Sequence, residues 1–286
     1  MRPRLLRAVY YVTLNHFVTI PQSLTSDLAY HGIKIFQVPY NSIEKFLPPK
    51  NMPPQSCLIL CDIPELCRAF LDADYYVVAV SHRDNRDAHF TNIKYVVEDF
   101  EELDWHYFVK YWQRYAGIPW EILKTERCRI REMCVDDLND LYDLYEDKRI
   151  CEYTEDLYAN RMAELNYIKD YVKNMYAFYN YGTWIIEDRF TGKIIGRAGF
   201  SMRPGFDDPE LGFVISPALW RHGYAYEVCT AIIDYGKNEL GFKRIHSFVR
   251  PENIPSLCLL DKLGFRSCGR YTIADHIHDR CILDLL

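Results

Sequence analysis

The 286-residue sequence predicts an α/β protein with two domains, a smaller one over residues 1–118 and a larger one over 122–286. Short apolar runs alternate with amphipathic helical patterns along the chain. A strand, a turn and a helix follow one another at 210–227, and the sequence Gly-Ile-Pro-Trp at 117–120 is typical of a hinge. With 49% hydrophobic and 26% charged residues, the chain has a globular composition.

The first domain shows the alternation that is typical of a small Rossmann-like α/β layer. The apolar run 56–61 predicts a buried strand, and Pro64 then begins a helix, because proline is favoured in the first turn. Upstream, the pattern at 27–32 predicts a helix that ends at Gly32, and no element is assigned before it. The remaining predicted elements are strands at 33–38, 75–80 and 93–97 and a helix at 103–115.

Asp62 directly follows the predicted strand 56–61. The domain loosely resembles a degenerate module of the haloacid dehalogenase type, whose phosphoryl-transfer enzymes place a nucleophilic aspartate here and a second one two residues later. Pro64 stands at the second position, so the acid/base pair is missing and we expect Asp62 to cap the following helix. We assign this domain no activity; regulation, recognition and dimerisation stay open as its role.

The second domain continues with two predicted helices, 135–146 and 162–179, separated by an acidic and aromatic connection at 147–158. A turn at Thr191-Gly192 joins the first two of the strands that follow. The predicted strands are 182–187, 194–200, 211–215 and 243–249, and a helix ending near Gly264 precedes a last strand that starts at Phe265.

The segment 210–227 (ELGFVISPALWRHGYAYE) carries the strongest functional signal. Its strand leads through the turn Ser216-Pro217 into a helix whose first turn is basic and contains a glycine. A helix start offers free backbone N–H groups and the positive end of the helix dipole, which suit a phosphate. Gly223 lets a phosphate approach without a Cβ in the way, and Arg221 adds positive charge.

The pieces ELGFV at 210–214 and WRHGYAYE at 220–227 resemble motif A of the GNAT superfamily of acyl-CoA N-acyltransferases, and within it the RimJ/RimL-like branch. Other pieces are similar to the same branch: N-x-x-S at 253–256, KLGF at 262–265, and LKTERCRIRE at 123–132, which resembles its first strand. The resemblance covers more than half of the chain. It implies a mixed-sheet GNAT fold with the element order β-α-α-β-β-β-α-β-α-β.

The resemblance also implies acetyl-CoA as the acyl donor and no metal. Backbone amides at the helix start would bind the pyrophosphate, and the preceding strand would pair with the extended pantetheine arm at a break in the sheet. Asn253 resembles an asparagine that contacts the cofactor in the family, although a role in a turn would also explain it. The predicted cofactor-binding residues are Phe213, Val214, Ile215, Arg221, His222, Gly223, Tyr224, Ala225 and Asn253.

Two residues are candidates for proton transfer. Glu210 stands where some family members have a glutamate that takes the amine proton through water; a solvated strand-end carboxylate or a structural salt bridge is the alternative. Ser256 could reach the leaving thiolate, or else cap a helix. Many relatives protonate the thiolate with a tyrosine at the position of Leu260, so the proton donor stays open here.

The connection between the two helices supplies candidate contacts for the amine acceptor. Glu152 and Glu155 could meet an ammonium group, and Tyr153 could wall the pocket, unless this charge run is a solvated loop. The net charge of −6 lies mostly in the second domain, which also suits a cationic amine. The acceptor, a protein N-terminal α-amine or a small-molecule amine, stays open.

Composition argues against several other partners. The acidic chain has no basic stripe for nucleic acid, and no apolar stretch reaches the ~18–20 residues of a membrane helix. Ten cysteines form no C-x-x-C pair, so we expect a cytoplasmic protein with reduced thiols, in which Cys57 and Cys61 pack in the core. Our overall interpretation is of a bacterial protein. His276 and His278 lack further ligands nearby, so no metal is expected. A monomer and a dimer both stay open.

These features predict an N-acetyltransferase that transfers an acetyl group directly from acetyl-CoA to a primary amine, without a covalent enzyme intermediate. The alternative is an acyl-CoA-binding regulatory module without turnover, which keeps the phosphate site and needs no base. The substitution Glu210→Gln separates the two, because it should stop transfer and spare cofactor binding.

Overall fold

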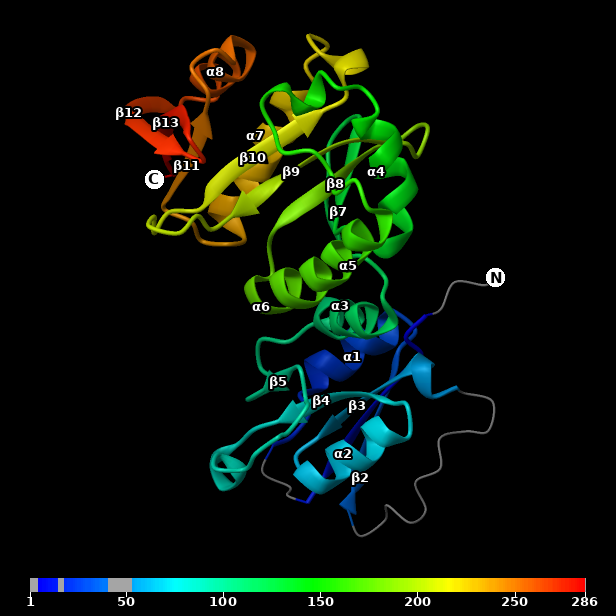
Figure 1. Cartoon of the computed structure of the whole chain (residues 1–286). Helices are drawn as coiled ribbons and strands as arrows, with labels where there is room; N and C mark the ends of the chain where they lie inside the picture. Colours follow the sequence, from blue (N-terminus) through cyan, green and yellow to red (C-terminus); the bar gives the residue numbers. More distant parts are fainter. Residues whose placement is uncertain (1–4, 15–17, 41–52, 286) are drawn as a thin grey trace. The chain divides into compact units, whose positions relative to one another are not determined.

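The structure is a computed structural model that describes residues 5–14, 18–40 and 53–285 (Figure 1). The chain forms two compact units, Met1–Ile118 and Pro119–Leu286. Both units are α/β, and the second contains a mixed sheet, so the predicted fold class is confirmed. Within the described ranges, no helix is long and apolar enough to span a membrane.

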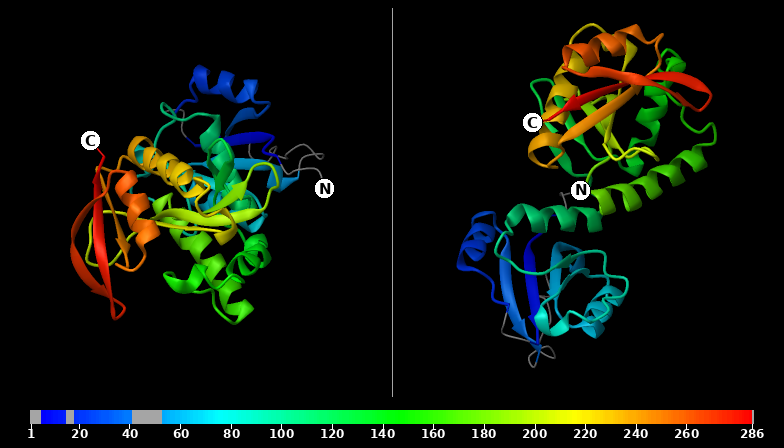
Figure 2. Two further views of the ribbon diagram at one scale, coloured as in Figure 1. Left: turned by 90° about the horizontal axis from the view of Figure 1, so that it is seen from above. Right: turned by 90° about the vertical axis from the view of Figure 1, so that its left-hand side faces the viewer.

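The first unit is built on a five-stranded parallel sheet with the strand order β2-β1-β3-β4-β5, a doubly wound order. Its strands are β1 (Ala8–Thr13), β2 (Lys34–Pro39), β3 (Cys57–Cys61), β4 (Tyr76–Val80) and β5 (Val96–Val97), and its helices are α1 (Gln22–Tyr30), α2 (Pro64–Asp72) and α3 (Trp105–Ala116). Helices α1 and α2 lie on opposite faces of the sheet (Figure 2, right). Cys57 and Cys61 are buried in β3, as predicted.

Strand β1 lies at the centre of this sheet and is covered on both faces. Val9 and Tyr11 pack in the cluster that contains α1 and α3, whereas Tyr10 and Val12 pack with Cys67 of α2. Every residue of β1 is buried. The sequence pattern does not reveal this strand, because a strand covered on both faces is apolar throughout and lacks the alternation of a half-exposed strand.

Asp62 does not cap α2, so that prediction is wrong. The helix begins at Pro64 with Ile63 as its N-cap. The buried Asp62 carboxylate instead accepts hydrogen bonds from the Thr13 hydroxyl and from the Leu14 N–H, at the carboxyl ends of β3 and β1. A local sequence pattern cannot show this contact, because β1 and β3 become neighbours only in the folded sheet.

The second unit is built on an eight-stranded sheet with the order β12-β13-β11-β10-β9-β8-β7-β6. Its strands are β6 (Glu121–Lys124), β7 (Cys128–Arg131), β8 (Thr183–Asp188), β9 (Ile194–Ser201), β10 (Glu210–Ile215), β11 (Arg244–Val249), β12 (Arg266–Ile273) and β13 (His276–Asp284). Its helices are α4 (Leu138–Tyr145), α5 (Arg161–Tyr171), α6 (Ala177–Tyr179), α7 (Tyr224–Asn238) and α8 (Ile254–Lys262). Neighbouring strands are antiparallel except for β10 and β11, which are parallel.

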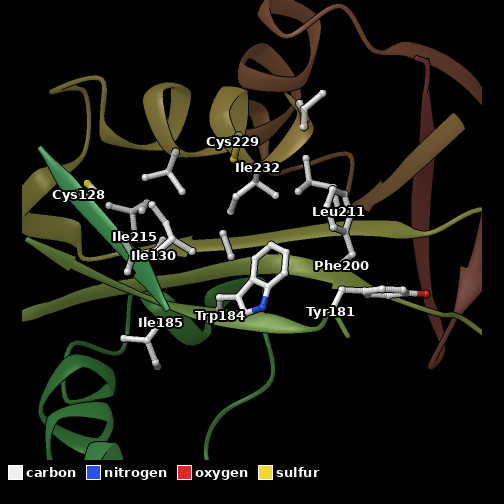
Figure 3. Packing of buried hydrophobic residues seen from close by; sticks show 14 of the residues in the cluster. Cys128, Ile130, Tyr181, Trp184, Ile185, Phe200, Leu211, Ile215, Cys229 and Ile232 are labelled. Carbon is white, nitrogen blue, oxygen red and sulfur yellow. The ribbon is translucent and has the colours of Figure 1, made fainter. Parts of the chain in front are cut away.

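Helix α7 covers one face of this sheet (Figure 3). Cys229 and Ile232 of α7 lie over Leu211 and Ile215 of β10, and all four side chains are buried in one cluster. Helix α4 packs against β9, and Ile185 of β8 points to this opposite face. Packing against α7 therefore fixes the position of β10, and with it the residues at both ends of the strand.

Three elements differ from the sequence prediction. The segment 123–132, predicted as one strand, is the hairpin β6–β7, and the last predicted strand is the hairpin β12–β13. The second hairpin turns at Ala274 and Asp275, which both have positive φ but show none of the usual Asn-Gly signal. The predicted helix 162–179 contains a π-helical turn at Val172–Tyr176.

Candidate active site

Strands β10 and β11 separate soon after they meet. They run parallel but pair only at Glu210 and His246. On its other side, β10 pairs with β9 along its whole length. Beyond Glu210, therefore, no described strand pairs with the β11 side of β10. The separation leaves an open backbone edge along β10, from Glu210 to the carboxyl end of this strand.

The pairing with β9 determines which backbone groups lie on this open edge. The N–H of Ser216 bonds to β9, so the groups of Val214, two residues earlier, also face β9. Those of Phe213 and Ile215 face the open edge, where the Trp220 indole donates to the Ile215 carbonyl at 2.7 Å. Val214 is thereby removed from the predicted backbone partners of a cofactor. The N–H and C=O of Phe213 and the N–H of Ile215 remain.

The chain enters α7 through a left-handed turn, at residues 221–225, which we call the phosphate loop. Arg221 and Gly223 have φ angles of 63° and 82°. Gly223 is the N-cap of α7, and no described side chain caps this helix. The N–H groups of Tyr224 and Ala225 in the first turn are therefore left for an anion, where the helix dipole also favours negative charge.

Arg127, which lies between β6 and β7 near the start of the second unit, anchors the phosphate loop. Its Nε and its backbone N–H donate to the Glu227 carboxylate at 2.6 and 2.8 Å. Its Nη1 donates to the His222 carbonyl at 2.9 Å, and its guanidinium lies 4.0 Å from the ring centroid of Tyr224. The pKa of Glu227 is lowered because, although partial burial opposes it, hydrogen bonds from Thr125 and Arg127 favour the carboxylate.

The structure changes the predicted set of cofactor contacts at two residues, His222 and Arg127. The N–H of His222 donates to the Leu219 carbonyl, so His222 offers no backbone donor to a phosphate. Arg127 joins the site, but it was not predicted from the sequence. Its partner Glu227 lies 100 residues further along the chain, so no motif contains both residues. The only local signal is that Arg127 belongs to the piece LKTERCRIRE.

Replacing Arg127 by methionine should weaken acetyl-CoA binding about 10-fold. The change removes the charge-assisted hydrogen bonds that order the phosphate loop. Each such bond stabilises the loop by about 1.5–3 kcal/mol, and relaxation of the loop in the variant reduces the net loss of binding free energy. Calorimetric titration measures the effect. Arg189→Met is the matched control, because the Arg189 side chain also lies at this end of the sheet but donates to the Thr125 and Glu126 carbonyls and not to Glu227 or the phosphate loop, and the substitution keeps the bond from its backbone N–H to the Arg127 carbonyl. Equal weakening by both variants would show that loss of positive charge, not loop order, is responsible.

Glu210 begins β10 and is almost fully buried. Its two oxygens accept hydrogen bonds from Nε and Nη2 of Arg203 at 2.6 and 3.0 Å. This bidentate pair holds the carboxylate in one orientation. Each oxygen keeps a second lone pair for a water or an amine proton.

Asn253 and Ser256 lie at the start of α8, beside the carboxyl end of β11. Asn253 is the N-cap, and its side-chain oxygen accepts the N–H of Ser256 at 3.2 Å. The capping role considered for Ser256 therefore belongs to Asn253. Leu260, one turn further along, is buried in the core, so α8 brings no proton donor at that position.

An open groove of about 530 Å³ lies between the segment that follows α4 and the β12–β13 turn. We call it the acidic groove, because three of its lining residues are carboxylates; it is lined by Glu152, Tyr153, Arg250, Glu252, Asp275, His276 and Ile277. The Tyr153 hydroxyl donates to the Glu252 carbonyl and Nη1 of Arg250 donates to the Glu152 carbonyl, both at 3.4 Å. These bonds join the two sides of the groove near the end of β11.

The acidic groove contains two of the three predicted acceptor contacts. Glu152 and Tyr153 line it, whereas Glu155 is exposed and lies outside the lining. The other lining residues were not predicted, because the groove brings together segments that are distant in the sequence. Within the described ranges, no group of three or more His, Cys, Asp or Glu side chains is placed to hold a metal ion.

An open strand edge that leads to an uncapped helix start suits an extended ligand with a phosphate at one end, such as an acyl carrier. A family model described as the acetyltransferase (GNAT) domain matches residues 127–266. The uncharacterized N-acetyltransferase YnaD of Bacillus subtilis is 30% identical over 148 residues, which cover 51% of this chain and 84% of that protein. The uncharacterized N-acetyltransferase YoaA of the same organism is 29% identical over 152 residues, 52% of this chain and 84% of that protein.

The fold has solved counterparts as well. The structure of ribosomal-protein-S5-alanine acetyltransferase from Vibrio fischeri superposes with a TM-score of 0.50 at 16% identity, over 57% of this chain and 95% of that one. The chain therefore belongs to the GNAT acetyltransferase family through its second unit, and it is an acyltransferase.

Proposed function

We propose that the second unit transfers an acetyl group from acetyl-CoA directly to a primary amine. The observation that carries this proposal is the separation of β10 from β11, which leads from the Glu210–His246 pair toward the phosphate loop. The amine nitrogen attacks the thioester carbonyl, a C–N bond forms, and the C–S bond breaks to release CoA as a thiolate, which then takes up a proton.

The open edge and the phosphate loop suit the two ends of the cofactor. The pyrophosphate fits the first-turn amides of α7 together with Arg221. The pantetheine arm would add to β10 as an extra strand, with Phe213 and Ile215 as its backbone partners. β10 spans about 20 Å at ~3.3 Å per residue. The acyl group would then lie near the point where β10 and β11 meet.

The acidic groove favours an acceptor that carries positive charge. Glu152, Glu252 and Asp275 supply three carboxylates, against Arg250 as the fixed positive charge. A solved structure with this fold is a ribosomal-protein-S5-alanine acetyltransferase, so peptides with a free N-terminal amine belong among the acceptors to test. Small amines with more than one ammonium group are the other class that the charge pattern suits.

Glu210 is the proposed base and acts through water. Arg203 keeps the carboxylate in place, and the second lone pairs of its oxygens remain for the proton. The Ser256 hydroxyl is the proposed donor to the thiolate, because Asn253 caps α8 and the hydroxyl is not needed for that role. A regulatory module that binds acyl-CoA without turnover is the second candidate, and the engagement of both Glu210 oxygens by Arg203 favours it.

Turnover with a panel of amines decides between these candidates. Release of the CoA thiol would be measured with N-terminal peptides and polyamines, and the products would be weighed by mass spectrometry. Glu210→Gln should lower kcat about 100-fold or more and leave the acetyl-CoA Kd within about threefold. Glu121→Gln, which also breaks arginine and lysine pairs, is the control and should have no effect. Acetyl-CoA binding without transfer to any amine would instead support the regulatory module.

A further inference from the structure

His246 lies at the point where β10 and β11 meet, and its side chain is completely buried. Its neighbours Ile245 and Val249 pack in the main core, whereas His246 contacts the rings of Phe206 and Phe248, with centroids 5.3 and 4.9 Å away. The imidazole therefore points away from the α7 side of the strand. It lies beside two aromatic rings, and its register partner on β10 is Glu210.

Arg280 determines which ring nitrogen carries the proton. Nδ1 of His246 lies 3.1 Å from Nη2 of Arg280, and a guanidinium can only donate. Nδ1 must therefore accept, and the proton of the neutral ring is on Nε2. Arg280 is held in turn by Asp208 at 3.2 Å. Burial, and then Arg280, lower the pKa of His246 to about 4, with Arg203 acting in the same direction and Asp208 opposing, so the ring is neutral at pH 7.

The Nε2–H group of His246 has no hydrogen-bond partner among the described residues. A buried N–H that stays unpaired costs about 1–3 kcal/mol, so a position of this kind is unfavourable unless another molecule supplies the acceptor. The donor is fixed in direction, because Arg280 holds the other side of the ring. A ligand group that fits here must accept a hydrogen bond and need not be charged.

The strand geometry indicates which part of a bound cofactor would lie nearest to His246. The open edge of β10 begins at the Glu210–His246 pair, and the phosphate loop lies beyond the opposite end of the strand. A carrier with its pyrophosphate on the loop and its arm along β10 would therefore bring its reactive end to the point where the backbones of Glu210 and His246 pair. The thioester carbonyl is the hydrogen-bond acceptor at that end.

We propose that the Nε2–H of His246 donates a hydrogen bond to the carbonyl oxygen of the bound acyl thioester; this inference rests on the proposed function. When the amine adds, the carbonyl π electrons move to this oxygen and the bond strengthens on the resulting oxyanion. Collapse of the adduct restores the carbonyl and expels the thiolate. His246 neither gains nor loses a proton in this sequence, so its role differs from that of an acid or a base.

Isotope-edited infrared spectroscopy of acetyl-CoA labelled with ¹³C at the carbonyl tests this directly and needs no acceptor. Binding to the wild-type chain should move the C=O band to lower wavenumber than in solution, because the hydrogen bond polarises the carbonyl. His246→Asn keeps an acceptor for Arg280 near the position of Nδ1 but has no donor at the position of Nε2, so this shift should be lost. His246→Gln places an amide N–H nearer to Nε2 and should restore part of it.

Calorimetric titration of each variant with acetyl-CoA shows whether the binding site is intact. The Kd should stay within about fivefold of the wild-type value, because the variant loses one hydrogen bond of about 1 kcal/mol. An unchanged band in His246→Asn, with binding retained, would show that another donor polarises the carbonyl, and it would overturn the role of His246 but not the proposed function. Absence of acetyl-CoA binding by the wild-type chain would overturn the proposed function and this inference with it.

Discussion

Replacing Gly223 by glutamate should abolish acetyl-CoA binding. We expect a wild-type Kd near 1 μM, about −8 kcal/mol, and an increase of at least about 100-fold in the variant. Gly223 is the N-cap of α7 and has φ of 82°, and an added Cβ would approach Nη2 of Arg127 at 3.5 Å. A carboxylate at this point fills the phosphate loop and repels the pyrophosphate, with about 4 kcal/mol of repulsion for a unit charge pair at 4 Å near a protein surface.

Calorimetric titration measures this effect, and the chain offers a matched control. Gly241 also has positive φ, at 69°, and nothing lies within 4 Å of a Cβ built on it. Gly241→Glu therefore introduces the same charge and a similar backbone strain beyond the far end of α7. It should leave Kd unchanged. Equal loss of binding in both variants would mean that strain or net charge is responsible, and the phosphate loop would lose its assigned role.

Replacing Arg131 by methionine should destabilise the second unit by about 3–5 kcal/mol. The Arg131 side chain is 8% exposed, and it donates to both oxygens of Asp137 at 2.6 and 2.8 Å and to Glu187 at 2.6 Å. Burial alone would lower the pKa of Arg131, but Asp137 and Glu187 outweigh it and raise the pKa. Without the guanidinium, the buried Asp137 carboxylate at the start of α4 loses its ion-pair partner, and Glu187 of β8 keeps Arg129 alone.

Hydrogen exchange measured by mass spectrometry gives this stability separately for each unit. Protection of peptides from β8 and β9 should fall in Arg131→Met, whereas peptides from β1 and β3 of the first unit should keep theirs. Arg129→Met is the matched control, because Arg129 lies two residues earlier on β7 and pairs with Glu121 and Glu187, but its side chain is 39% exposed. It should cost less than about 1 kcal/mol. A comparable loss in Arg129→Met would show that burial of the ion pair is not the cause.

The part of the site that could be predicted from sequence is the part whose residues are consecutive. The strand Glu210–Ile215, the turn and the start of α7 follow one another within 18 residues, so their strand and helix patterns define the phosphate loop directly. The acidic groove could be predicted only for Glu152 and Tyr153. Its other lining residues come from the segment that follows β11 and from the β12–β13 hairpin, whose turn has no glycine and was not predicted from the sequence pattern.

The sequence by itself determined the fold class, the family and the position of the phosphate loop, because each depends on hydrophobic periods and on short runs of adjacent residues. Only the tertiary structure decided the pairs that complete the site: Arg127 with Glu227, Arg203 with Glu210, and Arg280 with His246. The partners in the first and last pairs are 100 and 34 residues apart. Their meeting depends on strand order and register, which arise when the whole sheet buries its apolar faces and not from any local pattern.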